Sequence, residues 1–186
     1  VTASIGNLNA VESKEKQFHM LNVLNLMNFW FYGWATVGII FVSSDLVSLL
    51  FGSTYVMDIS IPIVLALNFY TVGMMNTIWN FKHTMGLFHY GRFVQFGTAA
   101  LNVVFSIILG YYWGLFGILF ATFLARLCTN LWYDPYAVYK FGFDKAPKAY
   151  LKKYLIYLLI LSAAICFCWI LCAHIHCAIW GQVVIK

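Results

Sequence analysis

Long apolar stretches separated by short polar segments dominate the chain. Each stretch comes close to the roughly 20 apolar residues that a helix needs to cross the hydrocarbon layer of a membrane. The stretches are continuous and do not alternate with polar residues, which argues against a transmembrane β-barrel. The pattern therefore predicts an all-α fold, a polytopic transmembrane helical bundle. The five predicted spans cover residues 21–42, 59–80, 93–112, 115–133 and 154–173.

The connections between these helices have their own signals. Trp113–Gly114 predicts a tight turn between the third and fourth helices. Asp134–Pro135 is expected to end the fourth helix, because the residue before a proline disfavours the helical conformation. The chain begins at Val1 with a polar segment, so we expect it to be the C-terminal part of a longer protein.

The distribution of charge gives an independent test of this segmentation. With five spans, the segments 1–20, 81–92 and 134–153 lie on one side of the membrane, and the loop 45–58 lies on the other. By the positive-inside rule, the three basic segments are cytoplasmic loops. Apart from Lys186 at the end of the chain and Arg126 within a helix, the cationic residues all lie in these segments. They are Lys14, Lys16, Lys82, Arg92, Lys140, Lys145, Lys148, Lys152 and Lys153.

Composition agrees with a lipid environment. Hydrophobic residues make up 63% of the 186 residues and charged residues 9%, whereas soluble domains carry about 25% charged residues. The mean hydropathy is +0.82. The net charge of +5 does not indicate a nucleic-acid partner, because the basic residues lie in short connections between apolar helices. The lipid bilayer is thus the first expected partner.

Polar residues within the first four helices fall on one face of each helix. Small and amide side chains often hydrogen-bond between membrane helices, and for any single asparagine this packing role is the better explanation. For four stripes together, we expect a hydrophilic cavity with the stripes facing it. The candidate cavity residues are Asn25, Asn28, Tyr32, Asn76, Asn80, Asn102, Thr122, Arg126 and Asn130.

Arg126 is the most informative of these residues. A permanent cation in hydrocarbon costs at least about 2.5 kcal/mol, so it faces a cavity, a partner or the membrane interface. The acidic residues are all expected in loops, which leaves Arg126 without a partner within the predicted spans. Two interpretations remain open: the side chain extends to the headgroups, or it binds an anionic ligand, because guanidinium makes bidentate hydrogen bonds with phosphate. Lys82 and Arg92 are candidates for a cytoplasmic mouth, although they also fit a role as topology anchors.

Signals for catalysis or metal binding are weak. The sequence has no P-loop and no HExxH motif, and no acidic residues are placed together for acid–base catalysis. Cys172, His174, His176 and Cys177 cluster near the end of the fifth span, but their spacing matches no standard zinc site. We therefore expect a protein that is not an enzyme and that has no cofactor and no metal.

Several segments resemble the C-terminal half of the O-antigen and capsule flippases, a Wzx-like family of the multidrug/oligosaccharidyl-lipid/polysaccharide exporter superfamily. The likeness lies in the order and spacing of short motifs over nearly the whole chain. These motifs are Ala3-Ser4-Ile5-Gly6-Asn7-Leu8-Asn9-Ala10, Phe51-Gly52-Ser53-Thr54-Tyr55, Gly86-Leu87-Phe88-His89-Tyr90-Gly91-Arg92, Trp113-Gly114-Leu115-Phe116-Gly117-Ile118 and Trp132-Tyr133-Asp134-Pro135.

The resemblance implies that the five spans are helices nine to thirteen of a fourteen-helix exporter. Such a protein lies in the bacterial cytoplasmic membrane and moves a polyprenyl-diphosphate-linked oligosaccharide to the outer leaflet by alternating access. A polysaccharide polymerase and glycosyltransferases are the implied protein partners. Arg126 fits the family's cationic cavity. The alternatives are a drug or metabolite exporter of the same superfamily and a membrane-embedded polysaccharide polymerase.

Overall fold

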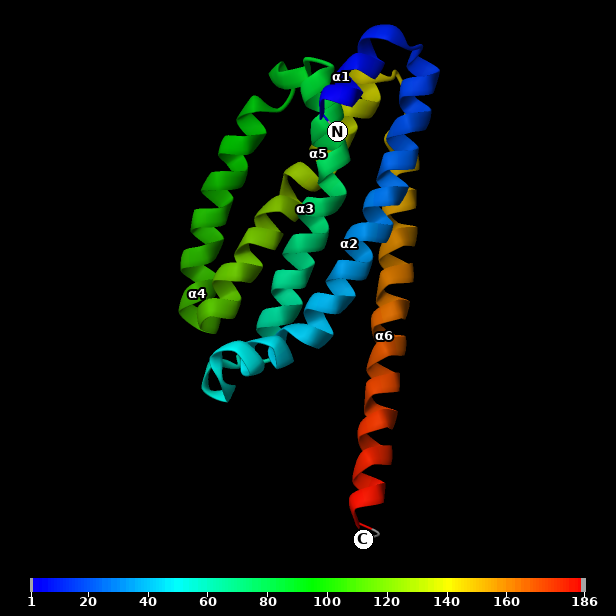
Figure 1. Ribbon diagram of the computed structural model, residues 1–186. Helices are drawn as coiled ribbons and strands as arrows, with labels where there is room; N and C mark the ends of the chain where they lie inside the picture. The colour runs from blue at the N-terminus through cyan, green and yellow to red at the C-terminus, as the bar shows by residue number, and fades with distance from the viewer. Residues whose placement is uncertain (1, 185–186) are drawn as a thin grey trace. The chain divides into compact units, whose positions relative to one another are not determined.

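The fold is all-α. The computed structural model describes residues 2–184, except for the side chains of Leu8, Ala173 and residues 175–184. Within these residues there is no strand. The elements are α1 (Thr2–Val11), α2 (Lys14–Phe51), η1 (Ser53–Tyr55), α3 (Ser60–Thr84), η2 (Leu87–His89), α4 (Arg92–Cys128), α5 (Asn130–Ala137), the π-helical η3 (Val138–Gly142) and α6 (Lys148–Val184) (Figure 1).

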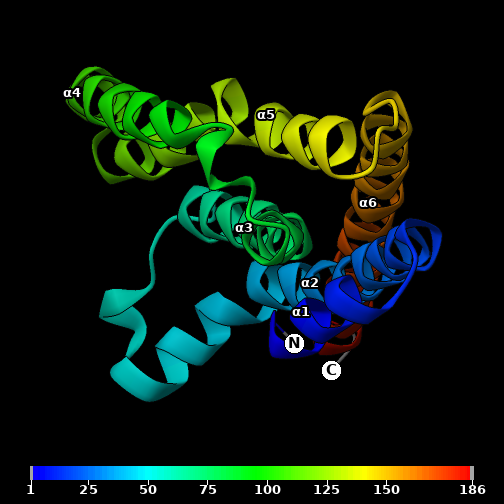
Figure 2. The same ribbon diagram turned by 90° about the horizontal axis from the view of Figure 1, so that it is seen from above.

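The chain divides into two compact units, residues 1–150 and residues 151–186. In the first unit α3 is the most buried helix and lies between α2 and α4 (Figure 2). Its fully buried side chains include Tyr70, Met74, Ile78 and Phe81. The second unit, as far as it is described, is the remainder of the apolar helix α6. The bundle core is therefore built around α3.

Four helical segments of the described chain are long and apolar enough to cross a membrane: Lys14–Phe51, Ser60–Thr84, Leu87–Gly142 and Lys148–Cys172. This identifies a membrane protein. The third segment is not one straight helix, because Gly114 has φ 57° and ψ −136°. The Asn102 side chain donates a 3.1 Å hydrogen bond to Thr122 Oγ1, although 20 residues of straight helix would hold them about 30 Å apart. α4 is thus a hairpin whose two arms correspond to the predicted third and fourth spans.

Helix boundaries differ from the sequence prediction because helices continue beyond their apolar parts. The segments 1–20 and 81–92 were expected to be loops, but residues 2–11, 14–20 and 81–84 are helical. Lysine, glutamate and glutamine are good helix formers, and hydropathy does not register them. Buried Gln17 donates to the carbonyl oxygens of Asn9 (3.2 Å) and Glu12 (2.8 Å), which secures the corner between α1 and α2.

The loop predicted for residues 45–58 is shorter than expected. α2 includes Asp45 and ends after Phe51, where Gly52 takes φ 97° and donates its N–H to the Ser48 carbonyl. Glycine ends helices in this way because it adopts positive φ without steric cost. Asp58 accepts hydrogen bonds from the backbone and side chain of Ser60 at the start of α3. The pKa of Asp58 is lowered, mainly by the hydrogen bond from the Ser60 side chain.

The predicted helix end at Asp134–Pro135 is also wrong. The break lies earlier, at Thr129 (φ −126°, ψ −87°), and α5 runs through Pro135. Thr129 Oγ1 donates to the Ala125 carbonyl (2.7 Å) and shares a 2.7 Å hydrogen bond with Thr98 Oγ1. Such side-chain hydrogen bonds offer the backbone an alternative to a regular helix. As a result, Asp134 lies in a helix and not in a loop.

Candidate functional site

The predicted polar stripes of α2 and α3 meet each other at the interface of these helices. The Asn28 side chain donates to the Gly73 carbonyl oxygen (3.0 Å) and to Thr77 Oγ1 (2.8 Å). A Cβ at Gly73 would lie 2.2 Å from the Tyr32 ring, so glycine is needed for this close approach. Tyr32 Oη in turn accepts a 3.5 Å hydrogen bond from exposed Asn76.

The stripe continues towards the end of α3. Asn80 donates to Asn76 Oδ1 (3.2 Å) and accepts a 2.7 Å hydrogen bond from Thr2 in α1. Asn25 differs from these residues, because its buried Oδ1 has no hydrogen-bond partner in the part of the chain that the structure describes. The Oγ1 of buried Thr36 has none either, and Thr36 lies 11 residues further along α2, on the same helix face.

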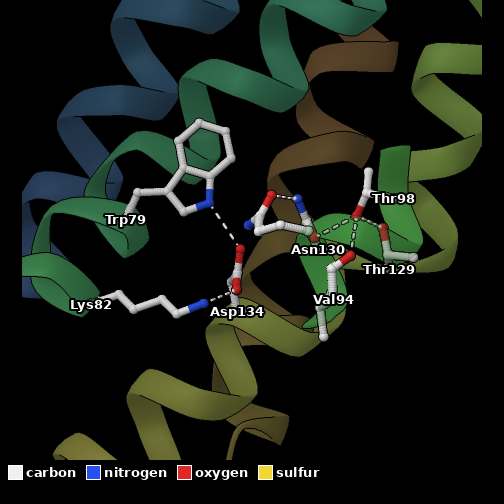
Figure 3. Close-up of polar contacts among 8 residues, drawn as sticks. Trp79, Lys82, Val94, Thr98, Thr129, Asn130 and Asp134 are labelled. Atoms are coloured by element: carbon white, nitrogen blue, oxygen red, sulfur yellow. Dashed lines mark hydrogen bonds and ion pairs between the residues drawn. The ribbon is translucent and has the colours of Figure 1, made fainter. Parts of the chain in front are cut away.

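The polar residues of α4 and α5 form a second cluster. Thr98 Oγ1 lies within hydrogen-bond distance of Asn130 Oδ1 (2.9 Å), Thr129 Oγ1 (2.7 Å) and the Val94 carbonyl oxygen (2.7 Å), and its single proton is donated to one of them at a time (Figure 3). The Asn130 amide donates to Gln95 Oε1 at 3.3 Å. These contacts join the first arm of the hairpin to α5, and the hydrogen bond between Asn102 and Thr122 joins the two arms. Most candidate residues are therefore engaged in helix–helix contacts, which is the packing role considered above, and a shared wet cavity stays a prediction.

Arg126 lies on the second arm of the hairpin and is half-buried. Its Nη1 donates a 3.1 Å hydrogen bond to Asn68 Oδ1 on α3, and the Asn68 amide donates to the Leu119 carbonyl oxygen (3.0 Å). None of the ion pairs among the described residues includes Arg126. A guanidinium has five N–H donors, so a neutral amide satisfies one of them and leaves the charge without a counterion.

The bundle also contains a buried ion pair that the sequence did not reveal. Lys82 Nζ is 2.6 Å from Asp134 Oδ1, with side-chain exposures of 11% and 0%. The Trp79 indole donates a 2.9 Å hydrogen bond to Asp134 Oδ2, so both carboxylate oxygens have donors (Figure 3). Lys82 was expected to lie in a loop as a mouth residue or topology anchor. Lys82 lies in a helix because α3 continues past residue 80, and Asp134 does so because α5 continues past residue 133, and both charged residues are thereby buried.

Lys82 and Arg92, the two predicted mouth residues, line the same cavity of about 520 Å³. Typical ligand pockets have volumes of about 300–1,000 Å³. Lys82 is buried, whereas Arg92 is exposed with its guanidinium 4.7 Å from the centre of the Phe93 ring. The lining residues are Trp79, Lys82, His83, Phe88, Gly91, Arg92 and Gln95.

Gly91 forms the part of this cavity next to the Lys82 ammonium. Its φ of +90° is left-handed, and a Cβ there would lie 3.1 Å from Lys82 Nζ and 2.6 Å from Tyr133 Cε1. Glycine is therefore required for the backbone conformation and for the space. The signal in the sequence was the run from Gly86 to Arg92, but nothing in it pointed to Asp134, which is 52 residues from Lys82.

Among the residues that the structure describes, no group of three or more His, Cys, Asp or Glu side chains is placed to hold a metal ion. Cys172 and His174 are exposed, whereas the side chains of His176 and Cys177 lie outside the described residues. That cluster is therefore not tested.

The fold and these buried polar contacts define a helical membrane protein with charged groups inside its bundle. No protein-family model, no curated protein and no solved structure matches the chain.

Proposed function

We propose that the protein is a flippase or exporter of the bacterial cytoplasmic membrane that moves a polyprenyl-diphosphate-linked oligosaccharide by alternating access. The observation that carries this proposal is Arg126. It is a half-buried cation within an apolar helix, and its partner among the described residues is a neutral amide. Ionisable residues within spans usually mark a substrate or ion pathway. An anionic diphosphate is a fitting counterion for a planar guanidinium.

Polar residues near Arg126 can also hydrogen-bond the sugar part of the substrate. Asn68 and Asn102 lie on helices that contact the second hairpin arm and present amide groups that can exchange partners. Exposed Asn76 has room for a further hydrogen bond. In this proposal the interhelical hydrogen bonds belong to one conformation, and the polar faces open to the substrate in another. Lys14, Lys16, Lys82 and Arg92 lie on the cytoplasmic side, following the positive-inside rule.

The test is a flipping assay in proteoliposomes with a fluorescent polyprenyl-diphosphate oligosaccharide and a quencher in the outer medium. We expect Arg126→Gln to lower the flipping rate at least about tenfold, which corresponds to the loss of about 1.4 kcal/mol of interaction. Arg126→Lys should keep part of the rate, because it keeps the charge but not the bidentate geometry.

The matched control is Lys16→Gln, which removes a cation from an exposed pair with Glu12 and should flip at the wild-type rate. Wild-type flipping by Arg126→Gln would refute the role of Arg126. Export of amphiphilic drugs without flipping of any polyprenyl diphosphate would replace the proposed function by drug export.

A further inference from the structure

The cavity beside α3 and α4 has the composition of an anion site. Two of its lining residues, Lys82 and Arg92, are cations, and no carboxylate is among its lining residues. Gln95 and His83 add polar groups, and the Phe88 side chain is 55% exposed. The cavity is therefore suited to a ligand that is negatively charged and accepts several hydrogen bonds.

The Lys82 ammonium has unused capacity towards this cavity. It carries three N–H donors, and within the described chain Asp134 Oδ1 is its hydrogen-bond acceptor. Asp134, in contrast, is fully buried and has both oxygens engaged, by Lys82 and by Trp79. A Cβ at Gly91 would lie 3.1 Å from the Lys82 ammonium, so the glycine keeps this part of the cavity beside Nζ free of a side chain.

We propose that this cavity binds a phosphate group through Arg92 and through the Lys82 donors that Asp134 leaves free, while Asp134 stays paired with Lys82 and weakens phosphate binding by its negative charge. Phosphate oxygens accept hydrogen bonds from Lys82 and Arg92 together, and charge-assisted hydrogen bonds of this kind are the strong ones. Asp134 keeps the buried lysine neutralised with or without phosphate, since an unpaired buried charge is strongly destabilising. The proposal concerns binding alone and does not depend on transport.

The phosphate can come from a lipid headgroup or from a soluble molecule, and two experiments distinguish these sources. In the first, inorganic pyrophosphate is titrated into the detergent-purified protein, and tryptophan fluorescence reports binding because Trp79 lines the cavity. In the second, the melting temperature is compared in nanodiscs of phosphatidylcholine with and without phosphatidic acid. A response to pyrophosphate without a response to phosphatidic acid indicates a soluble ligand, and a response to phosphatidic acid, with or without one to pyrophosphate, indicates a lipid headgroup.

Asp134→Asn gives the sharpest prediction. It removes the carboxylate charge, nearly preserves the side-chain shape, and raises the positive charge of the cavity. We expect phosphate to bind at least fivefold tighter to this variant than to wild type. The variant is expected to be less stable without ligand, and the phosphate probe should raise its melting temperature by more than that of wild type.

Arg92→Gln is the second variant, and it tests the site without touching the buried pair. Arg92 is exposed, so the fold should be preserved, and we expect phosphate to bind at least fivefold more weakly. The controls are Glu12→Gln and Lys16→Gln. Each breaks the exposed ion pair between Lys16 Nζ and Glu12 Oε2, which are 2.8 Å apart, and neither residue lines the cavity. Both should bind as wild type does.

The proposal is overturned if neither probe produces a response. It is also overturned if the responding probe binds Asp134→Asn no better than wild type, or if Arg92→Gln binds it as well as wild type.

Discussion

Lys82 and Arg126 are two cations of the same bundle with opposite surroundings. Lys82 is 11% exposed at its side chain and lies 2.6 Å from a fully buried carboxylate. Arg126 is half-buried, and its partner is the neutral amide of Asn68 at 3.1 Å. The first charge is compensated within the protein, whereas the second is not compensated by any described residue. The difference teaches that burial of a cation alone does not identify a ligand site; the nature of its partner does.

The largest loss of stability is expected when the counterion of Lys82 is removed. Asp134→Ala leaves Lys82 buried without a counterion, so the free energy of unfolding should fall by about 3–5 kcal/mol. Denaturation of the purified protein in detergent micelles measures this loss. The double substitution Lys82→Met with Asp134→Leu removes both charges and should recover most of the stability. An equal loss of stability in the single and double variants would show that the two side chains stabilise the fold by their packing and not by the attraction between their charges.

A smaller effect is expected at the neutral partner of Arg126. Asn68→Ala removes the hydrogen bond to the guanidinium and the one to the Leu119 carbonyl oxygen. Hydrogen bonds to charged groups contribute about 1.5–3 kcal/mol each in favourable cases, and half-burial places the expected loss near the lower end of that range. The same denaturation assay measures it. A loss as large as that of Asp134→Ala would remove the contrast between the two cations.

Removing the uncompensated cation itself should change stability still less. Arg126→Met deletes a charge that has no counterion among the described residues, so we expect a change within about 1 kcal/mol, in either direction. The Lys82→Met variant is the direct comparison, because it exposes Asp134 to the full cost of an unpaired buried carboxylate. Similar losses in the two methionine variants would contradict our assignment of Arg126 to an external anion.

The smallest effect belongs to the exposed pair of Lys16 and Glu12, at 69% and 37% side-chain exposure. Exposed ion pairs of this i,i+4 type contribute about 0.3–0.5 kcal/mol. Lys16→Gln should therefore be close to neutral in the denaturation assay. A loss above 1 kcal/mol would indicate that the start of α2 is more tightly packed than its exposure suggests.

The sequence was sufficient for the fold class and for the presence of helices long and apolar enough to cross a membrane. Apolar length is a strong signal because lipid requires every backbone polar group to be paired within the helix. The turn at Gly114 was also predictable, and the structure places a left-handed glycine there. Helix ends were less predictable, since Lys14 to Gln17 continue α2 by backbone hydrogen bonding that hydropathy does not measure.

The site was only partly predictable. Arg126 and the asparagine stripes stood out because polar residues in apolar helices are rare. Their mutual partners were not foreseeable from one sequence; Asn68, which holds Arg126, was not among the candidates. The Lys82–Asp134 pair was missed for a related reason. Both residues lie where hydropathy falls, so they were assigned to loops, and their pairing depends on the break at Thr129 and the path of α5 past α3.

The α4 hairpin has a consequence for how the chain enters a membrane. The hydrogen bond from Asn102 to Thr122 joins residues that leave the ribosome in quick succession. The first arm alone would place an unpaired amide in hydrocarbon, whereas the two arms together satisfy it. This pair of spans is therefore suited to insertion as one unit, and a premature stop after Gly114 should leave the first arm poorly integrated.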